Sequence, residues 1–165
     1  MQIVPYPHPA LRWKSSEINK IDDTLRAYVR EMFRMMYEAK GIGLAANQIG
    51  VPIRLFVANP SGEKESPEDE VVFINPVIRS RKGNAVGEEG CLSLPNLYAD
   101  VARADEITVE AFDLEGQGFR MKVKELPARV IQHELDHLDG VLFIDRLEDM
   151  ERAKLAAKVD DLSTE

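Results

Sequence analysis

Three residues within one short stretch have the types and the spacing for metal chemistry. His133 and His137 are four positions apart, and Glu134 directly follows the first histidine. On a helix, residues four apart share a face at about 5–6 Å, so both imidazoles can bind one metal ion. The carboxylate can then reach a water on that ion. The pattern predicts a hydrolytic metal site, although His-x-x-x-His also occurs by chance on surface helices.

The neighbouring residues predict the helix that this motif needs. Pro127 suits a first helical turn, because its φ is already helical and its missing N–H has no partner there. Ala128 to Leu138 carries an apolar stripe, and Gly140 supplies a stop. The stripe consists of Val130, Ile131, Leu135 and Leu138. We therefore expect the histidines on a helix with one face turned to a core.

Cys91 is the candidate third ligand. It is the only cysteine of the chain, and a lone cysteine is more often a small buried apolar residue. Its context favours a ligand, because Gly90 allows close backbone approach and Glu89 and Ser93 offer supporting polar groups. A thiolate would complete a Cys-His-His set with one position left for water. His8 lies between two prolines, and we expect it to be structural or exposed.

A glycine-rich stretch, Gly41–Gln48, lacks the Gly-Lys-Ser/Thr ending of a phosphate loop. Its small residues would let the chain pass close to a substrate backbone. The alternative is a helix stop followed by a packing contact between small residues.

The composition limits the class of protein. The 165 residues suit one domain over 1–165, and 44% hydrophobic with 30% charged residues is typical of a soluble globular chain. A net charge of −8 argues against broad nucleic-acid binding. No apolar run approaches the roughly 20 residues of a membrane span. The N-terminus does not resemble a signal peptide, and one cysteine permits no intrachain disulfide, so we expect a cytoplasmic protein.

Hydrophobic patterning places strands between helical segments rather than in alternation with them. Helices are expected over 22–40, 128–138 and about 148–160, and strands over 53–58, 71–78 with an interruption at Pro76, 107–112 and 119–123. The segment 59–70 is expected to be an exposed loop, and 79–84 a basic turn. This order predicts an α+β fold with antiparallel sheets.

Three blocks together resemble the peptide deformylase family. They are Gly41–Gln48 (Gly-x-Gly-x-Ala-Ala-x-Gln), Glu89–Ser93 (Glu-Gly-Cys-Leu-Ser) and Gln132–His137, with the histidine motif. Leu126–Arg129 is similar to the plastid-type branch. The resemblance implies antiparallel sheets around a central histidine-bearing helix, with N- and C-terminal helices. It also implies metal-dependent removal of the N-formyl group from N-terminal formyl-methionine of nascent polypeptides, releasing formate.

The resemblance also implies roles for individual residues. The metal ligands would be Cys91, His133 and His137, and Glu134 would be the general acid and base. The oxyanion donors would be the Gln48 side-chain amide and the backbone N–H of Leu92. Behind the ligands, the supporting residues would be Glu89, Asp136 and Arg103. The implied metal is Fe²⁺ in the cell, with Zn²⁺, Ni²⁺ or Co²⁺ in purified protein.

The residues of the implied methionine pocket match the family least closely. Its expected substrate-binding residues are Ile42, Gly43, Leu126, Val130 and Arg129, with the Gly43 backbone pairing with the substrate like an added strand. Gly87 and Arg129 stand where apolar residues are common in the family, and Tyr98 stands where some members have arginine. The shape of the pocket and the selectivity beyond the first residue therefore differ from one common family form.

Two other classes of function share some of these features. A metallopeptidase or a deacylase for other acyl groups would use the same histidine motif, and only a formyl-specific pocket would reject an acetyl group. A non-enzymatic module with a structural metal would need a fourth ligand and would leave Glu134 without a role. The last helix has basic residues that could meet the ribosome, but neighbouring acidic residues favour a solvated helix.

Overall fold

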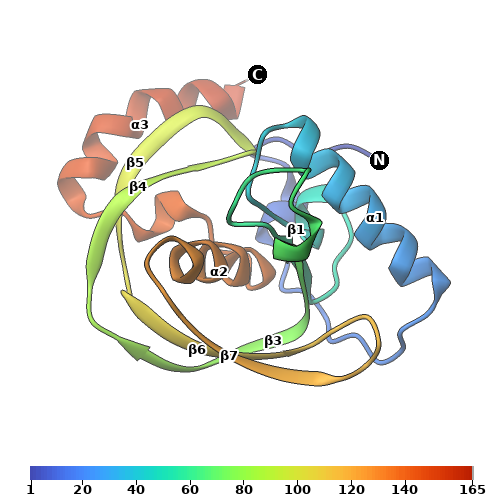
Figure 1. Cartoon of the computed structure of the whole chain (residues 1–165). Helices are drawn as coiled ribbons and strands as arrows, with labels where there is room; N and C mark the ends of the chain where they lie inside the picture. Colours follow the sequence, from blue (N-terminus) through green and yellow to red (C-terminus); the bar gives the residue numbers. More distant parts are fainter. Residues whose placement is uncertain (165) are drawn as a thin grey trace.

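The computed structural model describes residues 1–164. In that range it has three α-helices and two sheets, in which all neighbouring strands are antiparallel (Figure 1). The α+β prediction is therefore confirmed. In Figure 1, α2 lies in the middle of the view, the strands β3, β6 and β7 pass below it, and β4 and β5 curve around its other side. No helix in the described range is long and apolar enough to cross a membrane.

The helices are α1 (Asp23–Glu38), α2 (Glu125–Leu138) and α3 (Asp149–Thr164). The larger sheet has the order β1 (Gly43–Ala45), β2 (Leu55–Ala58), β3 (Val71–Lys82), β6 (Glu106–Phe112) and β7 (Gly118–Lys124). The smaller sheet is the hairpin of β4 (Ala85–Cys91) and β5 (Leu94–Arg103). Short 3-10 helices are η1 (Pro9–Arg12), η2 (Ala46–Ile49), η3 (Pro67–Asp69) and η4 (Phe143–Arg146).

Helix α1 forms as its sequence predicts. Asp22 caps it, since its Oδ1 accepts a hydrogen bond of 2.9 Å from the Leu25 N–H. Its apolar stripe, including Met32 and Met36, is buried against β1 and β2. The helix ends before Gly41, whose N–H reaches the carbonyl of Met36. These two methionines are therefore core residues.

The fold differs from the sequence prediction along β3. Instead of a strand interrupted at Pro76 and followed by a basic turn, β3 runs for 12 residues to Lys82. Pro76 fits because the pairing with β6 shifts register between Ile74 and Val77, where the ladder lacks regular partners. The residues over 79–82 are exposed, but 80–82 remain paired with β6, so only Gly83 and Asn84 form the turn.

Hydrophobic periodicity did not predict the hairpin of β4 and β5. Its residues pair from Ala85 with Arg103 to Cys91 with Leu94. β5 turns alternate residues inward, among them Leu97, which packs with η4 and α3. The hairpin therefore belongs to a hydrophobic cluster formed with the C-terminal part of the chain.

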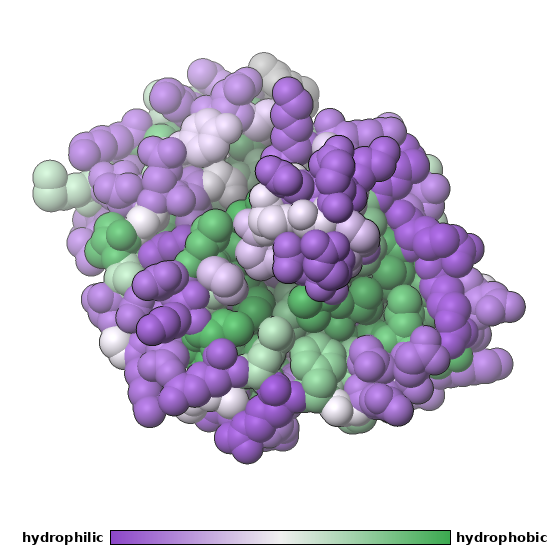
Figure 2. Space-filling view, viewed as in Figure 1, coloured by the Kyte–Doolittle hydropathy of each residue, from purple (hydrophilic) through white to green (hydrophobic). Residues whose placement is uncertain are grey.

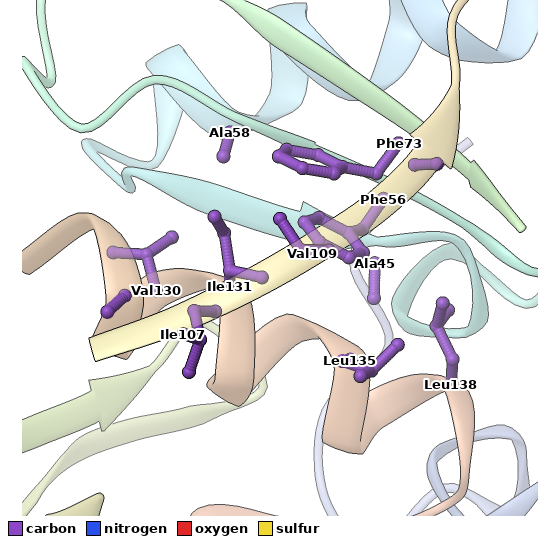
Figure 3. Packing of buried hydrophobic residues seen from close by; sticks show 12 residues of the cluster. Ala45, Phe56, Ala58, Phe73, Ile107, Val109, Val130, Ile131, Leu135 and Leu138 are labelled. Carbon is purple, nitrogen blue, oxygen red and sulfur yellow. The ribbon is translucent and has the colours of Figure 1, made fainter. Parts of the chain in front are cut away.

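Helix α2 packs its apolar stripe on the larger sheet. Val130, Ile131 and Leu135 belong to one cluster with Val109 and Phe56 of the sheet, and Figure 3 shows Ile131 next to Val109. Burial of each large aliphatic side chain stabilises the fold by about 1.5–3 kcal/mol. The helix begins at Glu125, slightly earlier than expected. The cluster thus fixes the helix whose other side carries the histidines.

Candidate metal centre

The candidate ligands come from two elements that meet at one point. His133 and His137 are one turn apart on α2, and Cys91 is the last residue of β4. The two Nε2 atoms are 3.2 Å apart, and Cys91 Sγ lies 3.4 Å from Nε2 of His137. One ligand atom from each residue lies within 4.8 Å of the others. The structure therefore brings together the three residues that the sequence singles out.

This donor set fits a divalent metal ion. Two imidazole nitrogens and a thiol face one another. A neutral imidazole has only one N–H, so these atoms cannot all be paired in hydrogen bonds among themselves. A cation would be attracted by the two nitrogen lone pairs and a thiolate at the same time. Cysteine and histidine together suit Zn²⁺ and Fe²⁺ better than Mg²⁺ or Ca²⁺.

Glu134 lies beside this group without a partner of its own. It is 2% exposed, and its Oε1 is 3.9 Å from Nε2 of His133 and 4.0 Å from Nε2 of His137. Its Oε2 has no hydrogen-bond partner among the described residues. Burial raises the pKa of Glu134 to about 7. A buried carboxyl that is half protonated near neutral pH can both accept and return a proton.

A close approach of β1 to Glu134 explains one glycine. A Cβ added at Gly43 would lie 3.0–3.1 Å from atoms of the Glu134 side chain. A side chain at this position would therefore require Glu134 or the strand to move by a few tenths of an ångström.

Glu89 connects the ligands to a buried charged network. Its Oε1 is 2.9 Å from Nδ1 of His133, and its carboxylate accepts two hydrogen bonds of 2.9 Å from Arg103. Arg103 also binds Asp136 at 2.6 Å. Burial alone raises the pKa of Glu89, but the hydrogen bonds with His133 and Arg103 outweigh it and hold that pKa at about 2. An ionised Glu89 therefore orients the His133 ring and directs its Nε2 to the ligand group.

The side chain of Gln48 is held over Cys91. Its Oε1 accepts a hydrogen bond of 2.9 Å from the Ala45 N–H, and its Nε2 lies 3.5 Å from Cys91 Sγ and 3.2 Å from Ser93 Oγ. Leu92 follows Cys91 at the wall of the same cavity. An amide N–H of Gln48 therefore points to the region around the candidate ligands.

The ligand group opens into a cavity of about 560 Å³. All five residues expected for substrate binding line it, namely Ile42, Gly43, Leu126, Val130 and Arg129. Tyr98 lies at the same cavity, with its ring against the backbone of Gly90. In Figure 2, apolar residues gather in the middle of the face shown and hydrophilic residues surround them.

Comparison with known proteins agrees with this geometry. The sequence profile described as "Polypeptide deformylase" matches residues 1–153. The chain belongs to the polypeptide deformylase family. A peptide deformylase of Acidobacterium capsulatum is 50% identical over 150 residues, which cover 91% of this chain and 88% of that protein. One from Rhodopirellula baltica is 42% identical over 165 residues, which cover 100% of this chain and 82% of that protein.

Plant members of the deformylase family are also similar, in agreement with the plastid-type resemblance. A chloroplastic peptide deformylase 1B of Oryza sativa is 47% identical over 148 residues, covering 89% of this chain and 55% of that protein. The crystal structure of a plant peptide deformylase PDF1B superposes with a TM-score of 0.95 at 40% identity, covering 98% of this chain and 88% of that chain. A Synechococcus elongatus peptide deformylase in complex with actinonin gives 0.92 at 40% identity, covering 98% and 86%.

For some residues of this deformylase-family site, the sequence did not predict the groups that they contact. Asn47 donates a hydrogen bond from Nδ2 to the carbonyl of His137, and Ser93 accepts one from Gln48. Both residues lie inside the blocks that resemble the family, but the sequence does not show which groups they contact. Phe143 stacks on His133 with ring centroids 6.2 Å apart, and no local pattern connects these two residues.

Proposed function

We propose that this chain is a metal-dependent peptide deformylase. It removes the N-formyl group from the N-terminal formyl-methionine of nascent polypeptides and releases formate. The observation that carries the proposal is the unpartnered, buried Glu134 beside the Cys-His-His group, in a chain of this family. A structural metal site would have no use for such a carboxylate, which is costly to bury.

In this proposal, Cys91, His133 and His137 hold the metal through Sγ and the two Nε2 atoms. The ion, when bound, lowers the pKa of water toward neutrality and polarises the substrate carbonyl. Glu89 holds the ring of His133, and Arg103 holds Glu89 and Asp136, so these residues keep the ligands oriented. We propose Fe²⁺ as the native ion, with Zn²⁺, Ni²⁺ or Co²⁺ in purified protein.

Glu134 moves the proton that the reaction requires. It takes a proton from the attacking water, whose oxygen forms a bond to the formyl carbon. It then gives this proton to the amide nitrogen as the carbon–nitrogen bond breaks. The products are formate and a free amine. Its pKa of about 7 suits both transfers, and protonation matters because an amide anion is a very poor leaving group.

Negative charge develops on the formyl oxygen during the attack. The Nε2 group of Gln48 and the backbone N–H of Leu92 would donate hydrogen bonds to it. Gln48 is suited to this because Ala45 fixes its oxygen, which leaves the amide nitrogen directed to the site. Loss of one such donor costs about 3–4 kcal/mol of transition-state stabilisation in other enzymes.

The substrate would lie along β1. This strand is at the edge of the larger sheet, so an extended peptide can pair with it at Gly43. The methionine side chain would enter the apolar part of the cavity formed by Ile42, Leu126 and Val130. The backbone contacts would fix the peptide direction, and the pocket would select the first side chain.

The place of action is a further part of this proposal. A reducing compartment with active translation, such as the cytoplasm, would keep the Cys91 thiol free and supply nascent chains. A ribosome contact through α3 has less support. Lys154 pairs with Glu151 at 3.2 Å, and Arg152 reaches the carbonyl of Asp145, so these basic groups are engaged within the chain.

Formate release from formyl-Met-Ala-Ser tests the proposed reaction. Anaerobically purified protein of known metal content should release formate, and the Glu134→Ala variant should keep the metal and lose the activity. Acetyl-Met-Ala-Ser should be a poor substrate, because a formyl pocket leaves little room for a methyl group. Equal rates on both peptides would favour a broader deacylase, and full activity of the variant would remove Glu134 as the base.

A further inference from the structure

Arg129 lies where the two halves of the candidate metal centre meet. The histidine helix packs with the larger sheet, through Val130 and its neighbours. Cys91 packs instead with the cluster of β5, η4 and α3. Apolar packing within each cluster therefore does not by itself set the spacing between the thiol and the imidazoles. That spacing depends on contacts between α2 and the hairpin.

The guanidinium of Arg129 makes three such contacts. Its Nη1 donates to Glu89 Oε2 at 2.7 Å and to the Val101 carbonyl at 2.9 Å. Its Nη2 donates to the Ala85 carbonyl at 2.8 Å. These partners include the backbone of both hairpin strands and the carboxylate that holds His133. The side chain is only 13% exposed, so water competes weakly for these hydrogen bonds.

Gly87 leaves the space in which this guanidinium lies. A Cβ added there would be 3.1–3.2 Å from Cζ, Nε and Nη2 of Arg129. Gly87 does not have a positive φ, so its backbone conformation does not require glycine. Space rather than backbone conformation favours glycine here, because a side chain at Gly87 on β4 would crowd the guanidinium of Arg129 on α2.

We propose that Arg129 is a positioning residue for the metal centre, with Gly87 as the residue that makes room for it. Through Glu89 and the two carbonyls, Arg129 keeps His133 at a fixed place relative to Cys91. The proposal rests on the proposed function in one respect, that Cys91, His133 and His137 bind the metal. The competing account is that Arg129 only fills space at the cavity wall.

Co²⁺ binding tests the proposal without a substrate. Metal-free wild type, Arg129→Met and Gly87→Ile are titrated with Co²⁺ against a competing chelator, and the cobalt–thiolate absorption is recorded. Arg129→Met should weaken Co²⁺ binding about tenfold, at the lower end of the range for residues that support metal ligands. Gly87→Ile should act in the same direction and alter the thiolate band, because its side chain displaces an intact Arg129.

Arg54→Met is the matched control. Arg54 is also a largely buried arginine that pairs with the α2 region, at 2.9 Å from Asp139, but it makes no contact with Glu89. Its loss should lower stability and leave Co²⁺ affinity and the thiolate band unchanged. Circular dichroism checks that each variant is folded, and if Arg129→Met is not, Gly87→Ile and Arg129→Lys carry the test. Arg129→Lys keeps the charge and should bind Co²⁺ more tightly than Arg129→Met.

The double variant Gly87→Ile/Arg129→Met distinguishes a positioning role of Arg129 from a role in filling space at the cavity wall. It restores volume at the wall but no donor to Glu89, so its Co²⁺ binding should stay weak. Wild-type affinity in the double variant, or in a folded Arg129→Met, would overturn the proposal. A wild type that binds Co²⁺ but releases no formate would refute the proposed reaction and leave this inference standing.

Discussion

Replacing Glu89 by glutamine should destabilise the protein by about 3–5 kcal/mol. Each carboxylate oxygen faces two N–H groups: Oε1 faces His133 and Arg103, and Oε2 faces Arg103 and Arg129. A glutamine has one oxygen, so its NH₂ must face two donors whichever way the amide turns. Loss of two charge-assisted hydrogen bonds at about 1.5–3 kcal/mol each gives about 3–6 kcal/mol, which includes the expected range. Breaking a buried ion pair costs a similar amount, about 3–5 kcal/mol.

The lowered pKa of Glu89 gives a second value for this loss of stability. Burial opposes ionisation of Glu89, but hydrogen bonds with His133 and Arg103 outweigh it and lower the pKa from 4.5 to about 2. That lowering corresponds to about 3 kcal/mol. Because the folded pKa is the lower one, this stabilisation is present above pH 4.5 and is lost as pH falls towards 2. The difference between wild type and Glu89→Gln should therefore narrow below pH 4.5.

Urea unfolding of the metal-free proteins, followed by circular dichroism at pH 7 and pH 4, measures this difference. In a chain of this size the loss corresponds to a fall in Tm of roughly 10 °C. Glu110→Gln is the control, since Glu110 pairs with Arg79 at 3.0 Å on an exposed surface and should change stability by less than about 1 kcal/mol. A loss at Glu89 no larger than in this control would refute the reasoning.

Three further results are expected. Gln48→Ala should lower kcat by about 10²–10³ through loss of one oxyanion donor, with the metal content unchanged; steady-state kinetics and metal analysis check this. Gly43→Ala should lower kcat/KM, because its Cβ would lie 3.0–3.1 Å from atoms of Glu134, and normal kinetics would show that β1 can shift. Iron-loaded protein should lose activity in air while zinc-loaded protein keeps it, and equal stability of the two would count against Fe²⁺ as the native ion.

The metal centre was predictable because its key spacing is local. His133 and His137 are one helical turn apart, so a five-residue pattern already places both imidazoles on one face. Cys91 lies 42 residues before His133 by sequence number, and no periodicity connects them. Its local context and the resemblance of three blocks to a family made it the candidate third ligand, and the structure brings the three residues together.

The parts that sequence reasoning missed depend on pairing between distant residues. β3 continues through Pro76 because a register shift in the ladder with β6 accommodates it, which no local signal encodes. The hairpin of β4 and β5 forms although β4 contains Gly87 and Gly90, which weaken a strand taken alone. Its stability comes from β5, whose inward residues pack on the C-terminal part of the chain.

Arg129 shows how the two kinds of information combine. In the sequence, Arg129 is a charged residue at an expected pocket position, and Gly87 likewise stands where apolar residues are common in the family. The structure explains both together, because the guanidinium occupies the space that a side chain at Gly87 would fill and binds Glu89. A larger residue at position 87 would crowd the intact Arg129. A smaller residue at position 129 would leave the space beside Gly87 unfilled. Gly87 and Arg129, which depart together from one common form of the family, are therefore best interpreted as a single structural unit.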